Sequence, residues 1–173
     1  AWGDLDVLFI DMPPGTGDAQ ITLAQSVPVT TGIVVTTPQK VALDDTKRSL
    51  DMFTKLHIPL AGIVENMSGF ICPESGKEYD IFGKGTTTQL ANDYNCPVLA
   101  NVPLEIAVRE GGDGGMPIVF GQPQSKSAEA YRKAANDLWI TIEKINEDGG
   151  VTNAAIQPTI GLDGKTSACS QAH

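Results

Sequence analysis

The chain has 173 residues, of which 41% are hydrophobic, and a formal net charge of -9. That length corresponds to about one domain with a sizeable core, and no apolar run approaches the roughly 20 residues of a membrane span. The acidity argues against a nucleic-acid or anionic-lipid surface, and three widely spaced cysteines fit a reducing cytosol, so we expect a cytoplasmic protein.

Short apolar runs alternate with longer amphipathic stretches, which is typical of an α/β protein with a parallel sheet. Four runs rich in Val, Ile or Leu are the predicted strands: Asp6–Ile10, Gly32–Thr36, Ala61–Glu65 and Val98–Val102. Four helices are predicted as well: Asp18–Ser26, Val41–His57, Lys84–Tyr94 and, after a loop-rich stretch at 103–124, Ser125–Ile145. Such connections place helices on both faces of the sheet and ligands at the carboxyl ends of the strands.

Two of these segments carry further expectations. The last helix places one apolar stripe toward the sheet: Ala128, Tyr131, Ala135, Leu138 and Ile142. The first strand, 6–10, has no polar alternation, so both of its faces require cover. Either the chain is a complete small domain with a buried first strand, or it lacks an N-terminal half. We favour the second interpretation.

An acidic residue and a loop rich in proline and glycine follow the first predicted strand. The run reads "DMPPGTGD", from Asp11 to Asp18. A carboxylate at the end of an apolar strand organises magnesium in Walker-B-type sites, and glycines let backbone amides approach a γ-phosphate. We therefore interpret Asp11, Gly15 and Gly17 as nucleotide-sensing residues, and Asp18 as a cap of the next helix. The alternative is a tight turn in which Asp11 is a capping or surface acid.

The phosphate loop that normally accompanies such a segment, G-x-x-x-x-G-K-[ST], is absent. "FGKGT" (82–86) has Gly85 where Ser or Thr is needed, and "GLDGKT" (161–166) follows no strand. Without that loop no lysine is placed on the β- and γ-phosphates. We therefore expect no ATP turnover by these 173 residues alone.

Five sequence blocks in order carry a family resemblance between about Leu5 and Trp139. They are "IDMPPGTGDAQITLAQ", "VTTPQKVALDD", "GIVENMSGFICP", "DIFGKG" and "VPLEIAVREGGDGGMPIV". The chain closely resembles the Mrp/ApbC family of iron–sulfur cluster carrier proteins, P-loop ATPases related to MinD and to the nitrogenase iron protein. The resemblance implies a three-layer parallel sheet of the MinD-like, deviant Walker A type that is incomplete at the N-terminus. Residues 1–146 would be the C-terminal part of that domain, and 147–173 a mobile tail.

The resemblance also implies where ATP and magnesium bind. Asp11 matches the acid near magnesium, and Gly15 and Gly17 match the loop that senses the γ-phosphate. Further residues expected at the nucleotide are Asn66 at the adenine edge, and Pro103, Glu105 and Arg109 in the loop over the base, which acts mainly through backbone. An Asn side chain both donates to and accepts from adenine, although a strand-end turn residue is the alternative for Asn66. Gln39 follows the strand at 32–36 on the ligand side and is a further candidate.

The metal motif departs from the family pattern. The family carries C-P-x-C, so that a homodimer holds one bridging [4Fe-4S] cluster with four thiolates. Here the run is Cys72, Pro73, Glu74 and Ser75. A serine hydroxyl stays protonated near neutral pH and lacks sulfur's softness for iron. Cluster binding is therefore lost, or is weak and completed by other ligands, or Cys72 is a bystander. Cys96 is expected to be a small buried hydrophobe, Cys169 has no partner at metal-site spacing, and His57 ends a helix.

The leading hypothesis is an ATP-binding iron–sulfur cluster carrier or scaffold that passes clusters to apo iron–sulfur proteins. In the full-length family ATP hydrolysis would gate a homodimer, so the family implies an ATPase. No nucleic-acid or membrane partner is expected. Two alternatives stay open: a MinD-like ATPase switch that acts through protein partners, and a structurally retained fragment without activity.

Overall fold

The computed structural model describes residues 3–13 and 17–149. The helices are α1 (Asp18–Ser26), α2 (Lys40–Lys55), α3 (Thr86–Asp93), α4 (Ile106–Asp113), α5 (Ile118–Gly121) and α6 (Lys126–Glu147). The strands are β1 (Gly32–Thr36), β2 (Leu60–Ile71), β3 (Glu78–Tyr79) and β4 (Val98–Leu104). The predicted bounds of α1 and β1 are confirmed, and those of α2, α3 and α6 differ by up to two residues.

The sheet is built around β2, which pairs in parallel with β1 on one side and with β4 on the other. Val34 of β1 lies beside Ile63 of β2, and the register continues to Thr36 beside Glu65. The expected α/β fold with a parallel core is therefore confirmed. The sheet is mixed, however, because β2 extends to Ile71 and pairs with the short antiparallel strand β3.

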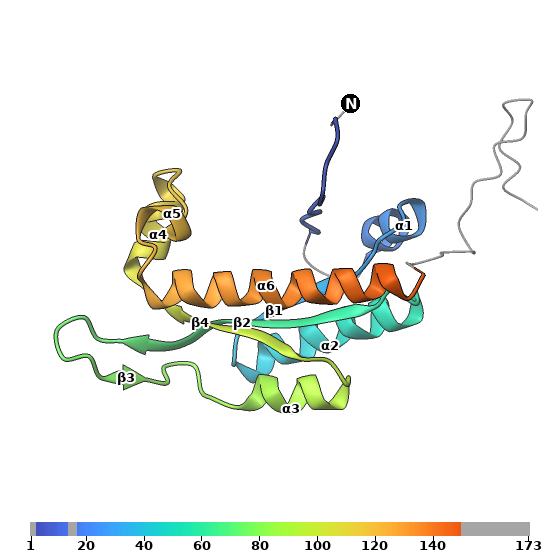
Figure 1. Ribbon diagram of the computed structural model, residues 1–173. Coiled ribbons are helices and arrows are strands. Elements are labelled where there is room, and N and C mark those ends of the chain that lie inside the picture. The colour runs from blue at the N-terminus through green and yellow to red at the C-terminus, as the bar shows by residue number, and fades with distance from the viewer. Residues whose placement is uncertain (1–2, 14–16, 150–173) are drawn as a thin grey trace, which may run out of the picture.

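Helices cover both faces of the sheet. Figure 1 shows α6 on one face and α2 and α3 on the other, which gives the three layers that the sequence predicts. The core between the sheet and the helices α2 and α3 consists of Val34, Leu43, Leu50, Ile63, Leu90 and Ala91. Leu43 and Leu50 are seven residues apart and share one face of α2. Burying one such leucine stabilises the fold by about 1.5–3 kcal/mol.

The last helix begins at a defined cap. The Ser125 hydroxyl oxygen accepts a hydrogen bond from the Ala128 amide at 3.1 Å, as an N-cap residue does. The predicted apolar stripe is only partly right, since Ala128 and Leu138 are buried whereas Tyr131 and Ala135 are exposed. Ser127 and Leu138 are both buried and lie on the same face of α6, because they are eleven residues, or about three turns, apart. The buried face of the helix is therefore shifted by about one residue from the predicted face.

The predicted strand at 6–10 is wrong. This segment has no strand structure, and Leu8, Phe9 and Ile10 are 52%, 70% and 42% exposed. A strand is stabilised by backbone hydrogen bonds to a neighbour and by packing of its two faces. Among the described residues no strand pairs with this segment, so its apolar sequence alone does not make it one.

The stretch 103–124, expected to be loop-rich, contains α4 and α5. Glycines at 111 and 112 masked the helical pattern, because glycine has a low helix propensity. A Cβ at Gly111 would lie 2.4 Å from the Met116 carbonyl oxygen, so the close approach of backbone there requires a glycine.

No helix within 3–13 and 17–149 has the length and apolar character needed to cross a membrane. The expected tail at 147–173 is described only to residue 149, so most of it, including Cys169 and the "GLDGKT" run, lies outside the described residues.

Candidate nucleotide and thiol sites

The segment that carries Asp11 is exposed. Asp11 follows the coil at 3–10, and within the described residues no hydrogen bond or ion pair links it to another candidate residue. Gly15 lies outside the described residues. Gly17 is the N-cap residue of α1, and its carbonyl oxygen accepts from the Gln20 amide at 3.2 Å. Asp18 is therefore the first residue of the helix and not the expected cap, although its charge still suits the N-terminal turn.

Gln20 anchors this segment to α1, a role that the sequence analysis missed. Its side chain is 3% exposed, and Nε2 donates to the Pro13 carbonyl oxygen at 2.6 Å. A buried amide needs such a partner, because burying an unpaired polar group is costly. The bond fixes the start of the proline- and glycine-rich loop beside the helix that follows it. A buried glutamine shortly after the loop gives no sequence signal of its own.

Polar residues occupy the carboxyl end of β1 and the residues that follow it. The Thr36 hydroxyl at the end of β1 accepts a hydrogen bond from the Thr46 hydroxyl of α2 at 2.7 Å. Gln39 is the N-cap residue of α2; its side chain makes no capping hydrogen bond and is exposed. The Gln39 side chain is therefore accessible after β1, and among the described residues no hydrogen bond links it to Asn66 or Asp11.

Asn66 lies where β2 stops pairing with β1. Glu65 is the last residue paired with β1, and Asn66 is opposite Val102 of β4. The Asn66 side chain is half-buried, and Oδ1 accepts from the Met67 amide at 2.9 Å. The pairing with β1 therefore ends just before Asn66, but the expected strand end is not there, because β2 continues to Ile71 and pairs with β4 as far as Phe70 beside Leu104.

The loop predicted to pack over the base begins next to Asn66. Pro103 directly follows Val102, the strand partner of Asn66, and its carbonyl oxygen accepts from the Ser127 hydroxyl at 3.2 Å. Glu105 Oε1 accepts from the Ser127 amide at 2.9 Å, so this carboxylate binds the N-terminal turn of α6. That contact satisfies a backbone amide that a helix leaves without an internal partner.

Arg109 lies on α4 with its side chain exposed. The guanidinium forms ion pairs with Asp113 at 2.9 Å and Glu110 at 3.1 Å. Both partners are exposed residues of the same helix, so the pairs contribute little to stability. The structure thus places Pro103 beside Asn66, while the charged groups of Glu105 and Arg109 have protein partners.

Cys72 directly follows β2 and begins the turn that joins β2 to β3. This hairpin extends away from the helical layers (Figure 1). The turn is closed by the Cys72 amide, which donates to the Lys77 carbonyl oxygen at 2.9 Å, and by the Gly76 amide, which donates to the Cys72 carbonyl oxygen at 2.8 Å. In the same turn the Ser75 hydroxyl oxygen accepts from the Lys77 amide at 3.4 Å.

The two described cysteines differ in acidity. The pKa of Cys72 is lowered, first by the hydrogen bond from the Ser75 side chain and then by the backbone amides of Ser75 and Glu74. Burial raises the pKa of Cys96, which packs against the core as the sequence predicts. Since the thiolate is the nucleophile and the metal ligand, Cys72 is the better suited of the two to metal chemistry.

One copy of the chain does not supply a complete set of metal ligands. Within the described residues no group of three or more His, Cys, Asp and Glu side chains is placed to hold a metal ion. Cys72 and the adjacent Ser75 offer one soft and one hard donor. They fit an iron–sulfur cluster only if a second copy adds the same pair from the same hairpin.

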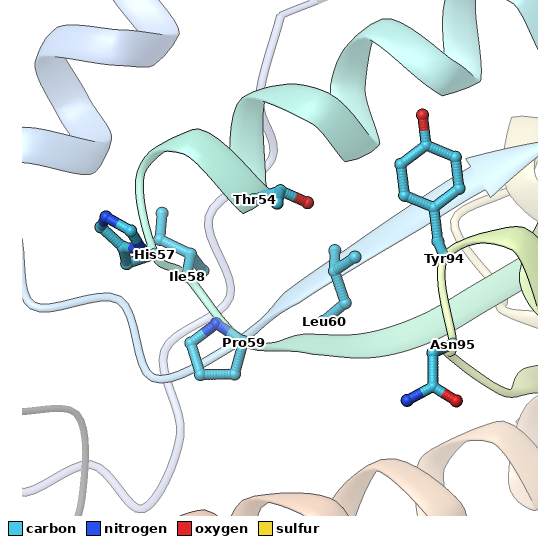
Figure 2. A pocket seen from close by; sticks show the side chains of 7 residues that line it. All are labelled: Thr54, His57, Ile58, Pro59, Leu60, Tyr94 and Asn95. Atoms are coloured by element: carbon cyan, nitrogen blue, oxygen red, sulfur yellow. The ribbon is translucent and has the colours of Figure 1, made fainter.

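A hollow of about 380 Å³ lies at the opposite end of the sheet from these residues. Figure 2 shows its lining: Thr54, His57, Ile58, Pro59, Leu60, Tyr94 and Asn95. His57 follows α2 with a left-handed backbone (φ 56°), as does Asn95 after α3 (φ 50°). Because Leu60 begins β2, the hollow is at the amino end of that strand and is separate from the nucleotide candidates.

Comparisons with known proteins identify the family. A family model described as ParA, a NUBPL iron-transfer P-loop NTPase, matches residues 1–139. An iron–sulfur cluster carrier protein of Helicobacter pylori is 56% identical over 169 residues, covering 98% of this chain and 45% of that protein. An iron–sulfur cluster carrier protein of Escherichia coli is 50% identical over 135 residues, covering 78% of this chain and 37% of that protein. The chain thus spans less than half the length of these relatives.

Solved structures agree on the fold. A nucleotide-binding protein from Archaeoglobus fulgidus in complex with ADP has a TM-score of 0.60 and 32% identity, over 75% of this chain and 49% of that one. The cell division ATPase MinD of Pyrococcus furiosus has a TM-score of 0.51 and 26% identity, over 65% of this chain and 43% of that one. The predicted resemblance and the MinD-like P-loop fold are therefore confirmed: the chain belongs to the family of ParA/NUBPL iron-transfer P-loop NTPases.

Proposed function

We propose that this chain is the base-recognising and cluster-carrying part of a cytoplasmic, ATP-dependent iron–sulfur cluster carrier. The observation that carries the proposal is the match to the iron-transfer family over residues 1–139, together with relatives named as cluster carriers. Because the chain spans less than half of those relatives, the proposed phosphate loop comes from polypeptide outside these 173 residues.

In this proposal Asp11 lies beside magnesium, and Gly15 and Gly17 lie at the γ-phosphate. Asp11 suits that role because it is exposed and its carboxylate has no protein partner within the described residues. Magnesium prefers hard oxygen ligands and keeps several waters, so one carboxylate with nucleotide and water oxygens is sufficient. When bound, the metal offsets the negative charge of the phosphates. The hydrogen bond from Gln20 to Pro13 would hold the loop behind Asp11.

Adenine recognition is assigned to Asn66 and the adjoining loop. The support is that Asn66 lies where β2 stops pairing with β1, opposite Val102 of β4, and that Pro103 directly follows Val102. We propose that Glu105 and Arg109 shape the backbone of this loop rather than contact the base, because their charged groups are engaged with Ser127, Glu110 and Asp113. Gln39, exposed after β1, is a further candidate contact.

The iron–sulfur cluster is the cargo of the proposed carrier. Each copy offers the Cys72 thiolate and the Ser75 hydroxyl on an exposed hairpin, so a homodimer would offer two thiolates in place of the family's four. Fewer thiolates imply weaker binding, which suits a protein that releases its cluster. The recipients would be apo iron–sulfur proteins with complete thiolate sets, because these bind the same cluster more tightly.

Cluster transfer tests this proposal. The full-length polypeptide is loaded anaerobically with iron and sulfide, separated from excess reagent and mixed with an apo-ferredoxin in the presence of a chelator. We expect the ferredoxin spectrum to appear, and to appear at a different rate when ATP and magnesium are added. A loaded protein from which no cluster reaches the acceptor, with or without ATP, would rule out the carrier function.

A further inference from the structure

Strand β2 is irregular just after Asn66. Between Asn66 and Phe70, β2 advances by four residues while its partner β4 advances only from Val102 to Leu104. The extra length is taken up in a bulge, in which Met67 has a left-handed backbone with φ 56° and Gly69 has φ 92°. A left-handed conformation is costly for a residue with a side chain, so surrounding contacts must hold it in place.

A hydrogen bond between Glu65 and Ser68 closes this bulge. The Ser68 hydroxyl donates to Glu65 Oε1, and the Glu65 side chain is only 4% exposed. In a regular strand, residues three apart lie about 10 Å from one another with side chains on opposite faces. The two side chains therefore meet only because the backbone folds back at Met67, and the bond in turn favours that fold.

The bulge determines how the Asn66 side chain is presented. Asn66 lies between the two bonded residues, and its Oδ1 accepts from the Met67 amide at 2.9 Å. The Asn66 backbone sets the position of the Met67 amide, and it lies inside the segment that the hydrogen bond between Glu65 and Ser68 closes. Within the described residues the Asn66 amide nitrogen has no protein acceptor and Oδ1 accepts one hydrogen bond, which leaves it a second lone pair. The Asn66 amide can therefore still both donate to and accept from a base.

We propose that Glu65 and Ser68 are positioning residues that give the nucleotide site its preference for adenine, acting through Asn66. The inference rests on the proposed function, because it takes the ligand to be a nucleoside triphosphate. Neither residue touches the base. Their hydrogen bond holds the bulge, the bulge orients the Asn66 amide, and that amide distinguishes the edge of adenine from the edge of guanine. The sequence alone gives no signal of a role for Glu65 or Ser68.

An isosteric pair of variants tests the inference in the full-length polypeptide. Ser68→Thr keeps the hydroxyl, and Ser68→Val has the same shape without it. Dissociation constants for ATP, GTP and inorganic tripolyphosphate are measured by calorimetry for both variants and for Asn66→Ala. The loss of one buried hydrogen bond changes an equilibrium constant by up to about tenfold. We expect Ser68→Val to reduce the ATP-over-GTP preference by about three- to tenfold, with Ser68→Thr close to wild type.

Tripolyphosphate binding is the control for folding, because it reports the phosphate side of the site without the base. It is expected to stay unchanged in all three variants; if Ser68→Val loses it, Ser68→Ala replaces that variant. If Asn66→Ala abolishes the ATP preference while the Ser68 variants without a hydroxyl keep it, the positioning role is wrong and the proposed function stands. If Asn66→Ala also keeps the preference, the assignment of Asn66 to adenine is wrong, and the positioning role is overturned with it.

Discussion

Gln20 of α1 donates a hydrogen bond to the carbonyl oxygen of Pro13 at 2.6 Å, and this bond joins the segment after Asp11 to the body of the protein. The donor is buried at 3% exposure, whereas Pro13 is exposed and lies in a segment without secondary structure. A side chain of the following helix therefore ties the segment that carries the proposed magnesium-binding residue to α1.

Replacing Gln20 should loosen that segment. We expect Gln20→Leu, which keeps the bulk but removes the donor, to raise the hydrogen-exchange rate at the Ile21 amide, which donates to the Gly17 carbonyl oxygen, by roughly fivefold. The reason is that one intramolecular hydrogen bond contributes about 1 kcal/mol. Gln89→Leu on the exposed side of α3 is the matched control and should leave this rate unchanged. Equal rates in wild type and Gln20→Leu would show that the bond does not restrain the segment.

The sequence predicted the parallel core because each element there is defined by local signals. β1 is a short apolar run, and α2 has a polar and an apolar face, so both were identified close to their bounds. The segment at 6–10 has an equally apolar sequence but no neighbouring strand among the described residues. A strand forms only beside a neighbouring strand, and the hydrophobic pattern of a segment does not show whether such a neighbour is present. The strand prediction for 6–10 failed for this reason.

The site residues divide in the same way. Asn66 and Cys72 are candidates that the family resemblance implies, since both lie in sequence blocks that carry it. The bond between Glu105 and Ser127 joins residues 22 positions apart, so its capping role depends on how α6 packs beside α4. Glu65 was read as an ordinary strand residue because the bulge that gives it a partner is a tertiary feature.

Glu105 is expected to matter for stability. Its carboxylate accepts from the Ser127 amide in the first turn of α6, where a negative charge also interacts favourably with the helix dipole. Glu105→Ala should lower the free energy of unfolding by about 1–2 kcal/mol, measured by urea denaturation. Glu110→Ala, which removes only an exposed ion pair with Arg109, should cost less than about 0.5 kcal/mol. Equal losses from the two substitutions would contradict the capping role.

Tyr94 should make stability depend on pH in the alkaline range. The hydrogen bond from its hydroxyl to Asp51 is 2.6 Å long and, with burial and nearby acids, raises the pKa of Tyr94 from 10.0 to about 12. The folded state therefore holds this proton more tightly than the unfolded state. The stabilisation is present in full below pH 10 and is lost as the pH rises toward 12.

Tyr94→Phe removes that contribution. Because the pair is largely exposed, we expect a loss of only about 0.5–1 kcal/mol in the free energy of unfolding at pH 8. The difference from wild type should shrink between pH 10 and pH 12. Tyr79→Phe, which alters a tyrosine that is 45% exposed, is the control. A difference that grows with pH over this range would show that the sign of the linkage is wrong.

The acidity of Cys72 should be visible in its alkylation. Because the Ser75 hydrogen bond lowers the pKa of Cys72 and burial raises that of Cys96, iodoacetamide should modify Cys72 first and at lower pH. Ser75→Ala should move the pH profile of Cys72 upward and leave that of Cys96 in place. Peptide mass spectrometry resolves the two sites. A Cys72 profile that is the same in Ser75→Ala and in wild type would exclude the serine as the cause.

The most direct test of the account is whether the Cys72 hairpin holds the cluster. The full-length polypeptide is reconstituted anaerobically with iron and sulfide, and visible absorbance and iron per dimer are measured for wild type, Cys72→Ala and Cys96→Ala. We predict a charge-transfer band in wild type and Cys96→Ala that is lost in Cys72→Ala. A band that survives in Cys72→Ala, or no band in wild type, would contradict the assignment of cluster binding to this hairpin.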